Sequence, residues 1–234
     1  MFISSARARS PRKTVLCLVA IGGQLAFVAA WAIAGALEPG YSASEQTVSE
    51  LAAGGAANPW ILWLGLLALS LSDGSTAALL RERLGRPGTL AAALFALAAA
   101  GVLVVLALPL DCMVSGDAAC RARIDAGELS WQHRGHNVAA ISVQLILIST
   151  PFAVAYALRG RRLARWALGA GVIGVATVLA VAASDPGAAG YGTYQRATFG
   201  FVHLWVIAIA IGAFRARSSR SRVARAWDSR AGSR

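Results

Sequence analysis

The apolar residues of this chain come in long uninterrupted blocks, separated by short polar segments. Lipid offers no hydrogen-bond partners, so a backbone that crosses the hydrocarbon core must satisfy itself as a helix. A core of about 30 Å requires roughly 20 residues at 1.5 Å each. The blocks predict an all-α, polytopic six-helix transmembrane bundle with spans at about 15–37, 59–80, 89–110, 137–158, 165–184 and 197–214.

Composition supports a membrane protein. Hydrophobic residues make up 57% of the chain and charged residues 14%, with a mean hydropathy of +0.59, whereas about a quarter of the residues of a soluble domain are charged. The first apolar block exceeds the 7–15 residues of a signal-peptide core, so we expect it to remain as the first helix. The chain then divides into a basic N-terminus (1–14), a membrane domain (15–214) and a basic tail (215–234).

The net charge of +11 is distributed unevenly between the connections. Basic residues lie in every second connection and at both ends of the chain, as the positive-inside rule describes. We therefore expect a plasma-membrane protein with both termini in the cytoplasm. The tail is typical of a segment near anionic head groups, and no nucleic-acid partner is expected. The connections 38–58, 111–136 and 185–196 are predicted to lie outside.

Two of the three cysteines, Cys112 and Cys120, share one predicted outer connection. An oxidising compartment permits a disulfide there, and two free thiols are the alternative. Cys17 lies in the first span and is expected to be inert packing.

Two residues inside the spans are unusual. Pro151 should kink the fourth span and free a backbone carbonyl. Asp73 lies in the inner half of the second span, where we expect a structural or snorkelling role; a proton relay is the alternative.

Polar residues gather where the spans reach the predicted outer surface. His133 and His136 precede the fourth span, and Asp111 ends the third. Arg196 opens the sixth, and His203 is about 10 Å deeper on the same helix. We expect His136 to face Asp111 and Arg196, and His133 to be more exposed. Ordinary contact with lipid head groups is the alternative explanation for any one of these residues.

Four segments carry a resemblance to a known family. In order, "YSASEQTVSELAAGGAANPWILWLG", "LALPLDC", "QHRGHNVAA" and "YGTYQRATFGFVHLWV" resemble a family of prokaryotic integral membrane proteins catalogued as domain of unknown function 998 (DUF998). The resemblance covers about residues 15–214 and implies six helices but no activity. The polar positions that it implies here are Ser49, Glu50, Asp111, His136, Gln195 and Arg196.

The first functional hypothesis is a non-enzymatic membrane protein with a polar site at the outer helix ends. It would bind a membrane lipid or an amphipathic small molecule, with no resident cofactor, and oligomerisation stays open. The ion pairs of this cluster would close the top of the bundle. Its residues are Ser49, Glu50, Asp111, His136, Asp185, Gln195, Arg196 and His203.

Other classes of function use some of the same residues, and whether any reaction is catalysed stays open. An intramembrane lipid hydrolase would place zinc on His133, His136, His203 and Asp111, or Asp185 in place of Asp111. A small transporter or channel subunit would use Asp73 and the kink at Pro151. A transmembrane haem requires two facing histidines at similar depth, and only His203 is expected to lie inside the bilayer.

Overall fold

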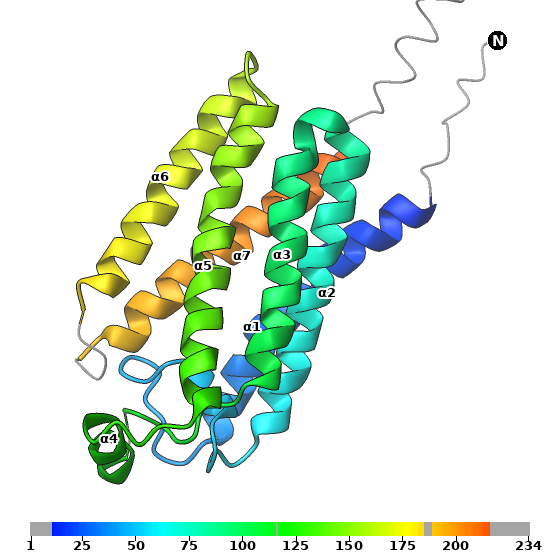
Figure 1. The fold of residues 1–234 in the computed structure, drawn as a ribbon. Coiled ribbons are helices and arrows are strands. Elements are labelled where there is room, and N and C mark those ends of the chain that lie inside the picture. Colours follow the sequence, from blue (N-terminus) through cyan, green and yellow to red (C-terminus); the bar gives the residue numbers. More distant parts are fainter. Residues whose placement is uncertain (1–10, 116, 185–188, 216–234) are drawn as a thin grey trace, which may run out of the picture.

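The structure is a computed structural model, and it describes residues 11–115, 117–184 and 189–215. Within these residues six helices are long and apolar enough to cross a membrane. The predicted all-α, six-helix architecture of a multi-pass membrane protein is confirmed (Figure 1). The helices are α1 (Pro11–Leu37), α2 (Pro59–Leu84), α3 (Thr89–Ala107), α5 (Trp131–Ala157), α6 (Arg162–Ala182) and α7 (Tyr191–Arg215).

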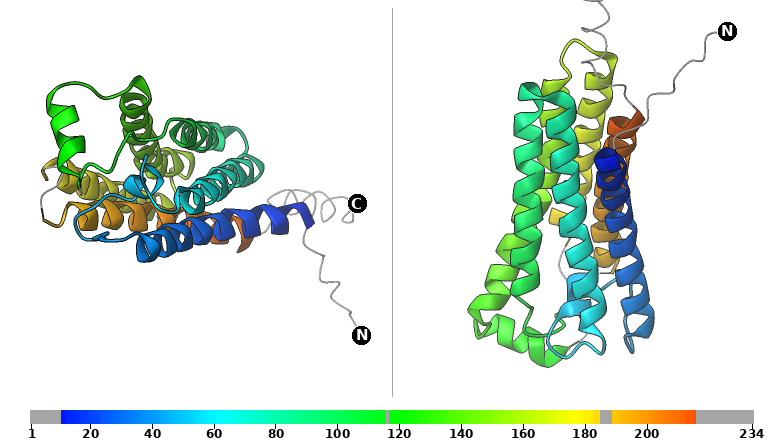
Figure 2. Two further views of the ribbon diagram at one scale, coloured as in Figure 1. Left: turned by 90° about the horizontal axis from the view of Figure 1, so that it is seen from below. Right: turned by 90° about the vertical axis from the view of Figure 1, so that its right-hand side faces the viewer.

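The six helices form a ring. Each of α1, α2, α3, α5, α6 and α7 contacts the next one in that order, and α7 returns to α1 (Figure 2). The backbones of α1 and α2 come into direct contact at Gly23, where an added Cβ would lie 2.3 Å from the carbonyl oxygen of Ala68. In α6, Gly171 lies against the ring of Phe152 from α5, and Gly174 against the ring of Phe201 from α7. The six helices therefore pack around a shared interior.

The two ends of the bundle differ. At one end lie two long connections, which carry the short helices η1 (Ser49–Ala52) and α4 (Ala118–Asp125) (Figure 1). We call the described residues of 38–58 and 108–130 the cap. At the opposite end, short turns join α2 to α3 and α5 to α6. In the cap, a disulfide links Cys112 to Cys120, and the backbone N–H of Gly54 donates to the carbonyl of Leu110 at 2.8 Å.

Several helix ends differ from the sequence-based bounds. The helix α5 begins at Trp131, six residues before the predicted span, because the hydroxyl of Ser130 caps it by accepting the N–H of His133 at 3.1 Å. Similarly, α7 begins at Tyr191. His133 and His136 therefore lie on α5, and Gln195 and Arg196 lie on α7.

Pro151 lies inside α5. A proline has no N–H for the carbonyl four residues earlier, which here belongs to Leu147. The hydroxyl of Thr150 donates to that carbonyl at 2.6 Å, and the indole N–H of Trp205 on α7 donates to the same hydroxyl at 2.9 Å. The carbonyl that the sequence predicted to be free is thus satisfied within the bundle.

Candidate functional site

Glu50 joins the two connections of the cap. Its side chain is only 1% exposed. Its oxygens accept hydrogen bonds from Gln46 Nε2 at 3.3 Å, and from the backbone N–H and hydroxyl of Thr47 at 3.2 and 3.1 Å. The backbone N–H and hydroxyl of Ser115, on the other connection, add bonds of 3.2 and 2.9 Å. A buried polar group is costly unless it is hydrogen-bonded, and this one has five donors.

Arg196 fastens the first connection of the cap to α7. Its guanidinium donates to the carbonyls of Ala43 and Gln46 at 2.5 and 2.8 Å, and to the hydroxyl of Tyr41. Burial raises the pKa of Tyr41 against the opposing charge of Arg196, so this hydroxyl stays protonated at neutral pH. Beside it, Gln195 Oε1 accepts the N–H of Val48 at 2.9 Å.

The expected network of ion pairs at the cap does not form in the described residues. Arg196 binds carbonyl oxygens instead of Glu50 or Asp111. The ion pair of the cap that the structure does show joins Arg123 to Asp111 at 3.4 Å. Asp185, the remaining acidic member of the expected cluster, lies outside the described residues.

His133 and His136 both bind the segment that leaves α3. The N–H of Asp111 donates to His133 Nδ1 at 3.2 Å, and His136 Nδ1 lies 2.7 Å from the carbonyl oxygen of Leu108. Two histidines three residues apart on α5 therefore meet two positions three residues apart on the neighbouring segment. The expectation that His133 is the more exposed is wrong, because both imidazoles are buried. His136 does face the interior, but Asp111 binds His133, and His136 binds Leu108.

Asp111 fixes the start of α5. Its carboxylate accepts the N–H of Ser130 at 2.8 Å and the Ser130 hydroxyl at 2.5 Å. Burial alone would raise the pKa of Asp111, but the hydrogen bonds from Ser130 and the charges of His133 and Arg123 lower it overall. Asp111 therefore has several partners within the cap and serves to join α3 to α5.

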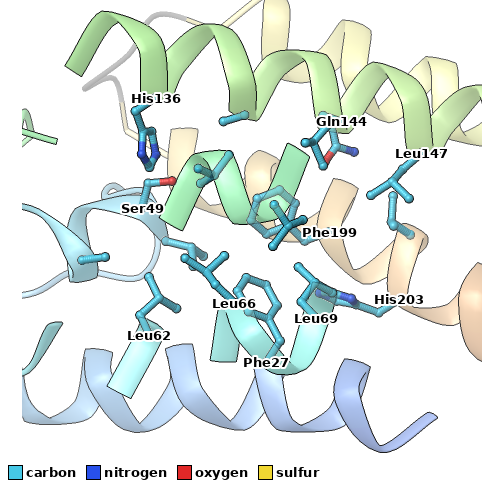
Figure 3. Close-up of a pocket in the computed structure, with 17 residues that line it drawn as sticks. Phe27, Ser49, Leu62, Leu66, Leu69, His136, Gln144, Leu147, Phe199 and His203 are labelled. Atoms are coloured by element: carbon cyan, nitrogen blue, oxygen red, sulfur yellow. The ribbon is translucent and has the colours of Figure 1, made fainter. Parts of the chain in front are cut away.

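A cavity of about 80 Å³ lies inside the ring of helices. We call it the central cavity; its wall comes from η1, α1, α2, α3, α5 and α7 (Figure 3). Four lining residues are polar: Ser49, His136, Gln144 and His203. The others are apolar: Phe27, Val48, Ala52, Leu62, Leu66, Leu69, Val102, Val105, Ala140, Val143, Leu147, Phe199 and Val202.

Three polar residues of this wall are only partly satisfied. Nε2 of His136, of Gln144 and of His203 is buried and has no hydrogen-bond partner in the described part of the chain. A buried donor or acceptor without a partner costs about 1–3 kcal/mol. Unlike the Glu50 and Asp111 side chains, these residues therefore retain free hydrogen-bonding capacity.

A buried chain of side chains continues from the central cavity. His203 Nδ1 lies 2.5 Å from Gln24 Oε1. Gln24 Nε2 in turn donates to the hydroxyl of Ser72 at 2.8 Å and to Asp73 Oδ1 at 3.3 Å. Asp73 is fully buried, so the snorkelling role considered for it is wrong. His203 thus belongs with α1 and α2 deep in the bundle, and not with the residues of the cap.

The ligands of the zinc hypothesis are not brought together. Asp111 and His133 bind each other in the cap, His136 binds Leu108, and His203 binds Gln24. Within residues 11–115, 117–184 and 189–215, no group of three or more His, Cys, Asp or Glu residues could hold a metal ion. These residues do not fit a zinc centre.

Two residues of this arrangement, Gln24 and Gln144, were not expected from the sequence. Each lies within a long apolar block. A polar side chain inside a span tends to face the bundle interior and a partner, so that signal was present. This signal for an interior site was weaker than the signal from the many charged residues at the helix ends.

The chain matches the family model described as "Protein of unknown function (DUF998)" over residues 20–212. This match confirms the resemblance that the four motifs carry. No curated protein and no solved structure matches the chain.

Proposed function

The chain belongs to the DUF998 family, and we propose that it is a binding protein which holds an amphipathic small molecule, or the end of a membrane lipid, in the central cavity. One observation carries this proposal. An apolar cavity has three polar side chains in its wall, and each has one buried nitrogen without a partner among the described residues. Binding sites for small molecules are mostly apolar, with a few placed polar groups.

The cap is a weaker candidate for the site. Glu50 and Asp111 already accept several hydrogen bonds each within the protein. A ligand that bound there would have to displace those donors. In the central cavity a ligand would instead gain contacts that the protein lacks.

The charge distribution supports a location of the cap outside the plasma membrane. Membrane-impermeant maleimide on intact cells tests this orientation with single substitutions at two exposed positions, Ser44→Cys in the cap and Arg161→Cys at the opposite end. We expect labelling at the first position alone. Labelling at Arg161→Cys alone would reverse the orientation.

Filling the central cavity tests the proposed function. Ala140 lines the cavity on α5, whereas Val138 on the same helix is 67% exposed. Ala140→Phe adds apolar volume inside and Val138→Phe adds it outside. Small molecules that co-purify in mild detergent are then extracted and quantified by mass spectrometry. We expect Ala140→Phe to lose the bound molecule and Val138→Phe to retain it.

Overpacking can also destabilise a protein, so Ala140→Leu provides a smaller addition if Ala140→Phe does not fold. A monodisperse elution profile and an unchanged thermal transition identify folded variants. Equal retention in all folded variants would contradict the proposal.

A second candidate function rests on the buried chain from His203 through Gln24 to Asp73. Ionisable residues inside a membrane often mark proton or ion paths, and Asp73 Oδ2 has no hydrogen-bond partner among the residues that the structure describes. Proton flux into proteoliposomes that disappears in Asp73→Asn would support this function. Absence of flux in the unsubstituted protein would remove it.

A further inference from the structure

We infer that the central cavity takes a neutral molecule with a hydroxyl group, and not a carboxylate, a phosphate or an amine. This inference rests on the proposed function and names the chemical class of its ligand. It follows from which atoms of the cavity wall are without partners, and from the charges that the wall lacks.

Two of the three unpartnered nitrogens are hydrogen-bond acceptors. The carbonyl of Leu108 and the Oε1 atom of Gln24 can only accept, so Nδ1 of His136 and of His203 must carry the proton. In a neutral imidazole the other nitrogen, Nε2, then offers a lone pair. Both histidines therefore require a donor from the ligand.

The tautomer of His203 is fixed by its neighbours. The Nε2 group of Gln24 donates to Ser72 and Asp73, which orients Oε1 towards His203. The rings of Phe27 and Phe199 lie 5.5 and 6.3 Å from the imidazole, centroid to centroid. Gln24 is in this sense a positioning residue, since it acts on a ligand through His203.

The third unpartnered group is a donor. Gln144 Nε2 can only donate, so it requires an acceptor. A hydroxyl group both donates and accepts, and it can satisfy either imidazole or the amide. A carboxylate, phosphate or ketone oxygen only accepts, and it could serve Gln144 but neither histidine.

Among the residues that the structure describes, no Asp, Glu, Lys or Arg lines the central cavity. An ion in an apolar environment is very costly without a partner of opposite charge. Arg196, which fastens the cap to α7, does not line the cavity and donates to the carbonyls of Ala43, Gln46 and Gly192. Ammonium, carboxylate and phosphate groups are all disfavoured for this reason.

The volume limits the size of the bound group. A single water needs about 10–15 Å³ of such space, and the cavity offers about 80 Å³. It can therefore receive a hydroxyl group with a short aliphatic segment, but not the head group of a phospholipid.

Photolabelling distinguishes these classes of ligand. The probes are an octanol and an octanoate that carry the same diazirine, applied to the full-length protein in nanodiscs at pH 8, with labelled peptides mapped by mass spectrometry. We expect the alcohol to label peptides of the cavity wall, and unlabelled octanol to compete. Half-saturation for the acid should require at least about tenfold more probe, because the acid loses one hydrogen bond and must also bury a charge.

Variants locate the effect. His136→Phe and His203→Phe each remove one acceptor while keeping a flat ring, and each should weaken labelling by the alcohol about tenfold without changing that by the acid. Two separate variants guard against loss of folding in one of them, which is checked by the thermal transition.

Three results are decisive in different ways. Preference for the alcohol that falls in the histidine variants supports the inference. Equal labelling of the cavity wall by both probes overturns the hydroxyl class and leaves the proposed binding function standing. If neither probe labels peptides of the cavity wall, both the hydroxyl class and the proposed binding function are contradicted, and water is then the expected occupant of the cavity.

Discussion

The cap and the central cavity treat their polar residues in opposite ways. In the cap, Glu50 accepts five hydrogen bonds and Asp111 two from Ser130 alone. In the central cavity, His136, Gln144 and His203 each keep one nitrogen without a partner. In the cap, hydrogen bonds of polar side chains join segments of the chain. In the central cavity, polar nitrogens without partners lie in apolar surroundings.

This difference separates structure from candidate function. The Glu50 and Asp111 side chains, which accept several hydrogen bonds within the protein, contribute to stability and have little left for a ligand. A half-satisfied group costs stability, so its presence in the wall of a cavity points to a partner from outside the chain. Variants of the cap should therefore change stability first, and variants of the cavity should change binding first.

Glu50→Ala should have the largest effect on stability. It removes the acceptor of five hydrogen bonds and leaves buried donors without a partner, including those of Ser115 on the other connection. We expect a loss on the order of 3 kcal/mol, measured as a lower thermal transition in detergent.

The matched control is Glu45→Ala, a change of the same type at an exposed position of the same connection. Its free energy of unfolding should stay within about 0.5 kcal/mol of that of the unsubstituted protein. Equal effects of the two substitutions would contradict the assignment of Glu50 as the centre of the cap.

Removal of the disulfide should have the next largest effect. Cys112 and Cys120 are eight residues apart, and a chain-entropy treatment gives about 2–3 kcal/mol for so small a loop. The loop carries Ser115, so Cys112→Ser with Cys120→Ser should also weaken its bonds to Glu50. Thermal unfolding with and without reductant measures this. In the double variant, reductant should have no further effect.

Acidification should weaken the cap through Asp111. Its pKa is lowered in the folded protein, so its stabilisation is present above the ordinary value of about 3.9 and is lost as the pH falls through the lower folded value. Asp111→Asn should lose this acid dependence, whereas Asp125→Asn, at an exposed position, should keep it. The same slope below about pH 4 in both variants would exclude Asp111 as its source.

Gln144→Leu should have the smallest effect on stability. It replaces an unpartnered amide by an apolar group of similar size, which can be nearly neutral or stabilising. The free energy of unfolding should stay within about 0.5 kcal/mol of the unsubstituted protein or rise, while retention of the co-purifying molecule falls. A loss as large as that of Glu50→Ala would show that the amide has a structural role.

The hydropathy pattern was sufficient to predict six helices, because the cost of an unsatisfied backbone in lipid leaves few alternatives. It did not predict that α5 begins at Trp131, since its start depends on the cap that Ser130 forms. The second span was predicted to begin at about residue 59, and α2 begins at Pro59, because proline needs no N–H partner in the first turn of a helix.

The candidate site was harder to predict, because sequence shows where polar residues concentrate but not which of them find partners. Glu50, Gln195 and Arg196 were expected in a ligand site, yet they bind the first cap connection. Gln144 lies in an apolar block, and its place in the cavity wall depends on how the helices pack together. Only tertiary packing distinguishes these two kinds of polar residue.

The most direct measurement is an experimental density map of the protein purified from its membrane in a mild detergent. We predict density that does not belong to the protein in the central cavity, within hydrogen-bond distance of Nε2 of at least one of His136, Gln144 and His203. A collapsed cavity in which these nitrogens bond to one another, or a bound molecule held by Glu50 and Arg196 in the cap, would contradict the account.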